Sequence, residues 1–136
     1  MTHPSPQRIQ LRRTKGWRKP DNTVVVARPS RWGNPWILAD LLEEWQHPET
    51  PTLQVLREAA TESFQAWLAG DLVCDGGYPA DNQRRDEILR DVGWLRGKNL
   101  ACWCPLPSPG QPDHCHAAVL LALANSPTPT EGLADG

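Results

Sequence analysis

Residues 99–124, NLACWCPLPSPGQPDHCHAAVLLALA, decide how this chain folds. The short apolar segment 99–102 predicts a strand, and the apolar run 116–124 predicts a helix. Between them, residues 105–112 contain four prolines, so they form an irregular loop. A strand end and a helix start therefore meet across this loop, and cysteines lie at both junctions.

The cysteines and a histidine of this stretch predict a metal site. On an extended segment, Cys102 and Cys104 point to the same face, while the residue between them points to the other. Cys115 and His116 lie just before the body of the predicted helix. Thiolates and an imidazole at such close range are typical ligands of tetrahedral zinc. We predict zinc as the cofactor, bound by the closed set Cys102, Cys104, Cys115 and His116, which is typical of a structural site.

Three alternatives stay open for the same residues. His114 can replace His116 as the imidazole ligand. Cys115 at a helix N-terminus, with a neighbouring histidine as base, can instead be the nucleophile of a thiol enzyme. The cysteines can also be side chains without a metal, either buried or joined in disulfides.

The rest of the chain alternates between strand and helix patterns. Residues 23–27 (TVVVA) form the clearest predicted strand, and their continuous apolar character favours burial on both faces. Residues 8–13 predict a weaker strand, and residues 72–74 fit a strand or a loop. Further helices are predicted over residues 37–46, 52–68 and 81–92.

We therefore predict a small single domain of the α/β class, with helices packed on a short sheet of three to four strands. The domain spans residues 8–125, and the ends 1–7 and 126–136 are predicted to be disordered. The helix over 52–68 has Thr52 as its N-cap, an apolar stripe that includes Leu53, and Gly70 beyond its end.

Composition narrows the class of protein. Hydrophobic residues make up 39% and charged residues 22% of the 136 residues, which is ordinary for a globular domain. No apolar stretch is long enough to cross a membrane, and the N-terminus lacks a secretory signal. We therefore expect a cytoplasmic protein without a membrane partner, in which thiols stay reduced.

Charge is distributed unevenly along the chain. Up to Arg31 there are eight basic residues against one acid, whereas the remainder carries 6 basic and 15 acidic residues. A basic arm on an acidic body can bind a nucleotide, a nucleic acid or another phosphorylated ligand, or it can fold onto its own acidic face. Trp17, Trp32 and Trp36 lie in or beside this region and suit base stacking, although each can equally fill the core, and Trp94 fits a core or helix-face position.

A second group of residues predicts ligand binding. Residues 28–35 (RPSRWGNP) follow the clearest predicted strand, at the position where α/β folds bind ligands. Gly33 permits close backbone approach, while neighbouring serine, asparagine and arginine side chains supply hydrogen bonds and charge. The alternative is a turn fixed by its Gly-Asn-Pro sequence, with solvated arginines. The predicted ligand-binding set is Arg13, Lys15, Trp17, Arg28, Ser30, Arg31, Gly33, Asn34 and Lys98.

Four motifs, in this order, resemble one protein family. They are residues 13–18 (RTKGWR), 28–35 (RPSRWGNP), 96–106 (RGKNLACWCPL) and 115–117 (CHA). The family comprises small uncharacterised proteins of bacteria, notably actinobacteria, and of their phages, and it is classed as a domain of unknown function. The resemblance spans residues 8–125 and implies no particular activity. This chain departs from the family in the longer link between its CWC and CH elements.

Two functions from different classes follow from these observations. The first is a zinc-stabilised protein that binds a nucleotide-like or phosphorylated ligand in a basic and aromatic cleft, as a binding protein or as an enzyme that processes nucleotides or nucleosides. The second is a non-catalytic zinc-containing module that binds nucleic acid or protein. The sequence contains no convincing catalytic acid or base, so we predict no catalytic residue.

Overall fold

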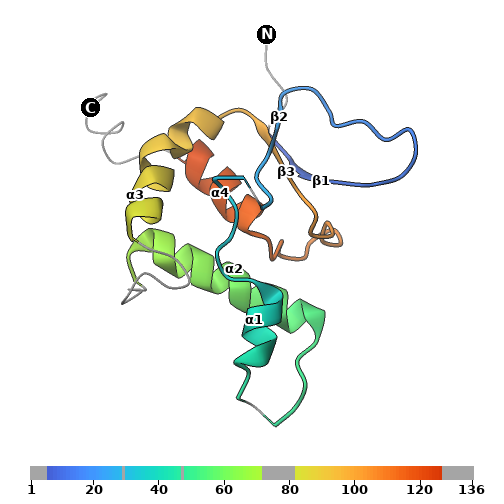
Figure 1. Cartoon of the computed structure of the whole chain (residues 1–136). Helices are drawn as coiled ribbons and strands as arrows, with labels where there is room; N and C mark the ends of the chain where they lie inside the picture. Colours follow the sequence, from blue (N-terminus) through green and yellow to red (C-terminus); the bar gives the residue numbers. More distant parts are fainter. Residues whose placement is uncertain (1–5, 29, 47, 72–81, 127–136) are drawn as a thin grey trace.

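The computed structural model describes residues 6–28, 30–46, 48–71 and 82–126. The predicted strand at 72–74 and nearly all of the predicted disordered ends lie outside these residues. The chain forms one small α/β domain, in agreement with the predicted class (Figure 1). Its elements in chain order are β1 (Arg8–Gln10), β2 (Thr23–Val25), α1 (Leu38–Glu43), α2 (Leu53–Ala69), α3 (Asn82–Asp91), the 3₁₀ helix η2 (Val92–Leu95), β3 (Asn99–Cys102) and α4 (His116–Asn125).

The sheet contains three parallel strands in the order β1-β3-β2, so the last strand of the sequence lies in the middle. Leu100 of β3 lies opposite Val24 of β2. The ladder continues beyond the strands, because the N–H of Val26 donates to the carbonyl of Ala101. The carboxyl ends of all three strands therefore share one edge of the sheet, where β3 ends at Cys102.

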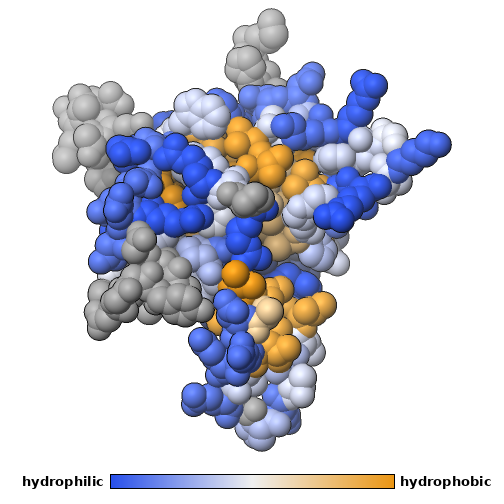
Figure 2. Space-filling view, viewed as in Figure 1, coloured by the Kyte–Doolittle hydropathy of each residue, from blue (hydrophilic) through white to orange (hydrophobic). Residues whose placement is uncertain are grey.

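The connection between β1 and β2 is a long loop that extends from the body of the protein (Figure 1). Parallel strands require a connection of roughly a dozen residues or more. Residues 11–22 meet this requirement without forming a helix. Hydrophilic side chains dominate the outer end of this loop (Figure 2), which we call the basic loop because of its arginines and lysines.

The core lies between the sheet and the helices. α4 packs against β3 and β1, and α2 packs against α4. Leu100 of β3, Leu120 of α4, and Phe64 and Trp67 of α2 are all fully buried there. Within the described part of the chain, no helix is both long and apolar enough to span a bilayer.

The central strand, β3, is the most deeply buried strand. Leu100 is fully buried, whereas the residues of β2 are half-buried at the edge of the sheet. In the predicted strand 23–27, the buried residues are Val26 and Ala27, which follow β2. The predicted burial on both faces is therefore confirmed for the end of this segment, at Val26 and Ala27, but is wrong for Thr23–Val25, because α4 packs mainly over β3 and β1.

The α2 helix begins and ends where the sequence predicts. Thr52 Oγ1 accepts a hydrogen bond of 3.1 Å from the N–H of Val55, and Gly70 adopts the left-handed conformation (φ 87°) that closes the helix. Phe64, in the middle of the predicted apolar stripe, is fully buried. Leu53 is 64% exposed, because the first turn of α2 extends beyond the core.

The structure decides between the roles that the sequence leaves open for two tryptophans. Trp32 is buried in the core and does not present its ring to a ligand, whereas Trp94 lies on a helix face and is 61% exposed. In η2 it is Leu95 that points inward and is fully buried, so Trp94 lies on the outer side of this 3₁₀ turn. The ammonium group of Lys98 lies 4.8 Å from the centre of the Trp94 ring.

The turn after β2 is held by hydrogen bonds and by close packing. Asn34 Nδ2 donates to the carbonyl of Ala60 in α2, and its Oδ1 accepts from the N–H of Trp36. A Cβ atom added at Gly33 would lie 2.5 Å from Cγ and 3.1 Å from Cα of Arg28. Gly33 therefore allows the turn to pack directly against Arg28.

We expect Gly33→Ala to lower the free energy of unfolding by about 1–3 kcal/mol, because the added methyl group forces Arg28 or its backbone to move. Gly93→Ala is the matched control, since its Cβ would meet no atom within 4 Å. The control should be neutral or stabilising by up to about 1 kcal/mol. Urea denaturation measures both changes, and equal stability of the two variants would contradict the packing described for Gly33.

Candidate metal centre and adjoining cavity

The candidate metal ligands lie at the carboxyl edge of the sheet. Cys102 is the last residue of β3, Cys115 is the N-cap of α4, and His116 is the first residue of that helix. Cys115 has an extended backbone (φ −145°, ψ 141°), while its carbonyl accepts a hydrogen bond from the N–H of Ala118. This change from extended to helical backbone lets two adjacent side chains approach the same point.

Cys102, Cys115 and His116 form a compact group that can hold a metal ion. Their ligand atoms all lie within 4.8 Å of one another, and all three residues are buried. Cys115 Sγ lies 4.0 Å from His116 Nδ1. Around a tetrahedral zinc ion, two sulfur ligands are about 3.8 Å apart, so small movements would bring these atoms to bonding positions.

Cys104 lies beside this group without belonging to its tightest part. Its sulfur is 4.0 Å from Cys102 Sγ, and its side chain is half-buried. Trp103 points outward and is 46% exposed, as the predicted alternation between Cys102 and Cys104 requires. None of these three cysteines forms a disulfide in the structure.

A backbone carbonyl fixes the orientation of the His116 ring. His116 Nε2 lies 2.7 Å from the carbonyl oxygen of Val26, which only accepts hydrogen bonds, so Nε2 carries the proton. Nδ1 then presents its lone pair toward Cys115. The ring also packs edge-on against Phe64, at 5.4 Å between ring centres. In a metal-binding histidine, the ring nitrogen that does not bind the metal typically donates a hydrogen bond, as His116 Nε2 does here to the carbonyl of Val26.

His114, the alternative imidazole ligand, points elsewhere. Its Nε2 lies 3.4 Å from Glu58 Oε1 of α2. It does not belong to the compact group found among the described residues. The structure therefore favours His116 over His114.

The sulfurs of the cluster shift one another's pKa values. Hydrogen bonding with the neighbouring thiols of Cys104 and Cys115 lowers the pKa of the Cys102 thiol far below its usual range. The same hydrogen bonding raises the pKa of Cys104 to about 11, and it raises that of Cys115 further. Binding of a metal cation at this cluster would release protons from the thiols.

Hydrogen bonds from Arg8 stabilise the loop that contains Cys104. Its guanidinium donates to both carboxylate oxygens of Asp113, at 2.7 and 3.1 Å. It also donates to the carbonyls of Cys104 (2.7 Å) and Pro105 (2.6 Å). One buried side chain in β1 thereby holds both ends of the proline-rich segment, which lie next to the cysteines.

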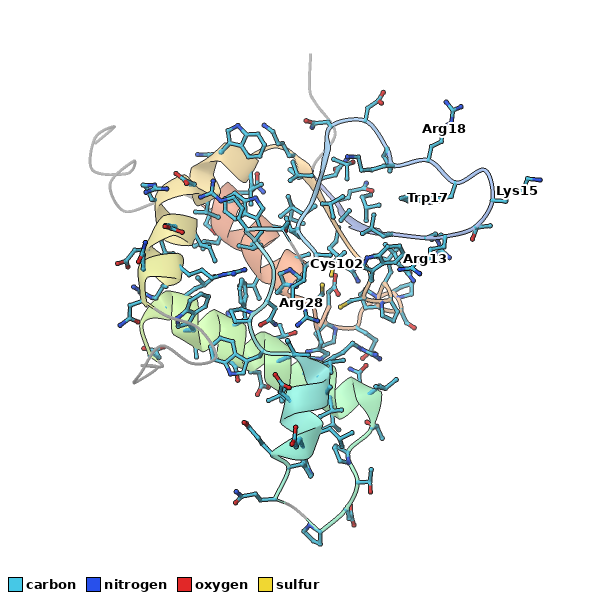
Figure 3. The ribbon with its side chains drawn as sticks, viewed as in Figure 1. Arg13, Lys15, Trp17, Arg18, Arg28 and Cys102 are labelled. Atoms are coloured by element: carbon cyan, nitrogen blue, oxygen red, sulfur yellow. The ribbon has the colours of Figure 1, made fainter. Side chains whose placement is uncertain are left out.

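A cavity of about 180 Å³ adjoins the cluster at the same edge of the sheet. Arg28, from the segment after β2, and Cys102 lie close to this edge in Figure 3. Arg57 enters the wall from α2 on the other side. The wall combines ligand groups of the metal cluster with two arginines and two tryptophans, namely Cys102, Cys104, His116, Arg28, Arg57, Trp36 and Trp103.

The structure brings together only part of the predicted ligand-binding set. Arg28 and Asn34 line the cavity, and Gly33 lies beside them in the turn. Ser30 and Arg31 line a different pocket, of about 560 Å³. Arg31 is also paired there with Asp91 of α3.

The remaining four residues lie on the basic loop or near the exposed end of the sheet. The guanidinium of Arg13 lies 4.8 Å from the centre of the Trp103 ring, which is part of the cavity wall. Lys15 extends into solvent at the end of the loop, and Trp17 points into the loop (Figure 3). Lys98 lines a separate pocket, on the side of the β2 start.

Two features of this region could not be predicted from the sequence patterns: the position of Arg57 in the cavity wall and the contact of Arg8 with Asp113. Arg57 lies one turn before Ala60 and Thr61, and these two small buried residues leave the space that the cavity occupies. A small residue pair on the inner face of an otherwise bulky helix is a signal for such a space. The Arg8–Asp113 contact joins residues 105 positions apart and has no local signal.

We expect His116→Ala to abolish metal binding, because it removes the imidazole and its hydrogen bond to Val26. His114→Ala is the matched control and should keep about one metal ion per chain. Elemental analysis of protein purified without chelator measures this. Retention of the metal by the His116 variant, or less than about a tenth of an equivalent in the wild type, would contradict the site.

Comparison with known proteins places the chain in a family. The family model described as "Domain of unknown function (DUF4326)" matches residues 9–126. No curated protein and no solved structure matches the chain. The matched segment contains all the strands and helices except the first residue of β1, together with the cluster and the cavity. The chain therefore belongs to this family, the domain of unknown function DUF4326.

Proposed function

We propose that this chain is a zinc-stabilised protein that binds a nucleotide-like, phosphorylated ligand in the cavity beside its metal centre. The observation that carries the proposal is the pair of arginines, Arg28 and Arg57, on the wall of a cavity that also has two tryptophans. Guanidinium groups bind phosphate oxygens through two hydrogen bonds at a time, and indole rings stack on bases. The cavity also lies at the carboxyl edge of a parallel sheet, where α/β proteins commonly bind ligands.

The donor set supports zinc. Thiolates of Cys102 and Cys115 together with an imidazole suit zinc far better than magnesium or calcium, which prefer oxygen ligands. Cys104 is the natural fourth ligand, because its sulfur lies 4.0 Å from Cys102 and a modest movement would close a tetrahedral set. Zinc bound there would join the end of β3 to the start of α4.

The thiol-enzyme alternative has less support. Cys115 is only 1% exposed, and its sulfur is enclosed by Cys102 and His116. A nucleophile has to reach its substrate, and this sulfur does not. The described residues of the cavity wall also include no carboxylate placed as a general acid or base. A binding role therefore fits these contacts better than catalysis by a thiol.

We expect zinc to be the metal in protein purified from cells, at about one ion per chain, because of the thiolate and imidazole donors. Removal of the ion with a chelator should lower the melting temperature of the wild type but not that of His116→Ala. Elemental analysis and calorimetry test both statements. Iron, as the ion recovered without exposure to oxygen, would contradict the assignment of zinc.

We expect nucleotides to stabilise the protein in a thermal-shift panel of nucleoside mono-, di- and triphosphates. Arg28→Gln and Arg57→Gln should each weaken binding about tenfold or more, because each removes a charge-assisted hydrogen bond to phosphate. Arg90→Gln is the control, since Arg90 lies on α3 and is paired with Asp91. Stabilisation by no member of the panel would overturn the proposed function.

A further inference from the structure

The basic loop carries a strong positive charge that the described residues do not neutralise. Residues 11–22 contain two lysines and three arginines against the single acid Asp21, and all five cationic residues are exposed. Among the residues that the structure describes, none of these five cations is paired with a carboxylate. Lys15 and Arg18 point away from the body of the protein (Figure 3). Such a loop attracts anions over a distance of about 10 Å at moderate salt.

The basic loop begins at the edge of the sheet where the cavity lies. The N–H of Leu11 donates to the carbonyl of Cys102, so the loop leaves the sheet beside the candidate metal centre. Arg13 then lies over Trp103, whose ring belongs to the cavity wall and is 46% exposed. Cavity, tryptophan and basic loop therefore form one continuous surface.

The size of the cavity limits which part of a ligand it encloses. Its volume of about 180 Å³ is below the roughly 300 Å³ at which sites for whole small molecules begin. A phosphate and part of a nucleotide would fill it, and the rest of a longer ligand would continue across Trp103 in the cavity wall. On that path the ligand meets the cations of the basic loop, beginning with Arg13.

We propose that the ligand is the end of a single-stranded nucleic acid. Its terminal nucleotide lies in the cavity with its phosphate between Arg28 and Arg57, the next base stacks on Trp103, and the following phosphates lie along the basic loop. This inference rests on the proposed function and names the substrate class. Single strands fit better than duplexes because an exposed indole requires an unpaired base, and repeated phosphates match a series of cations.

The test compares a mononucleotide with oligothymidylates of two, four and eight nucleotides, using calorimetry at several salt concentrations. Affinity should rise at least tenfold from the mononucleotide to the octamer. The double variant Lys15→Gln/Arg18→Gln should reduce the dependence of log affinity on log salt by about 0.7 for each lost phosphate contact. The control Arg90→Gln/Arg96→Gln removes the same charge from other elements and should keep the wild-type slope.

Stacking is tested separately at Trp103. Trp103→Ala should weaken octamer binding by about 5- to 100-fold, and Trp103→Phe should recover most of the loss. Zinc content is measured in each variant, so that a damaged metal centre is recognised. A polyglutamate of equal charge serves as the control for an acidic protein partner. Equal binding of polyglutamate and octamer, with no effect of Trp103→Ala, would overturn the inference.

The outcomes separate this inference from the proposed function. Mononucleotide binding that depends on Arg28, with no gain in affinity for the octamer, would overturn the inference and leave the proposed function intact. Octamer binding that does not change in Arg28→Gln would show that the loop acts without the cavity, and this too would overturn it. Tighter octamer binding that depends on Arg28, Trp103 and Lys15 together supports it.

Discussion

The hydrogen bond from His116 Nε2 to the carbonyl of Val26 is the contact on which the carboxyl edge of the sheet depends. It joins the start of α4 to the segment that leaves β2, and it fixes which ring nitrogen faces Cys115. Without it the imidazole would lose the contact that fixes which nitrogen carries the proton, and the sulfurs of Cys102 and Cys115 would lack an oriented third donor. The same hydrogen bond holds His116 in the cavity wall, so it stabilises both the candidate metal centre and the cavity.

A sheet of three very short strands needs such supports, because its own ladder is small. Arg8 provides a second one by holding Asp113 and the carbonyls after β3 with four hydrogen bonds. These bonds orient the proline-rich segment, which has little regular hydrogen bonding of its own. A metal ion bound at the cluster would add a third connection between β3 and α4. Binding of that ion would then contribute directly to the free energy of folding.

The cavity and the basic loop meet because of the sheet order. β1 and β2 run parallel on either side of β3, so the chain has to cross from one to the other through residues 11–22. The crossing starts beside Cys102, and its first part places Arg13 over Trp103 of the cavity wall. The basic loop thereby begins at the edge of the sheet where the proposed phosphorylated ligand would enter.

The sequence by itself determined the elements and the chemistry of the cluster. Thr52 and Gly70 mark the ends of α2 through local capping, and the spacing of Cys102, Cys115 and His116 around a strand end and a helix start predicts their convergence. Tertiary structure alone decided the sheet order, the choice of His116 over His114, the contact of Arg8 with Asp113, and the separation of Arg31 and Lys98 from the cavity. Local patterns report backbone conformation and the face of an element, because they depend on neighbours in sequence. They carry no information about which distant side chain lies opposite, and that depends on how the whole core packs.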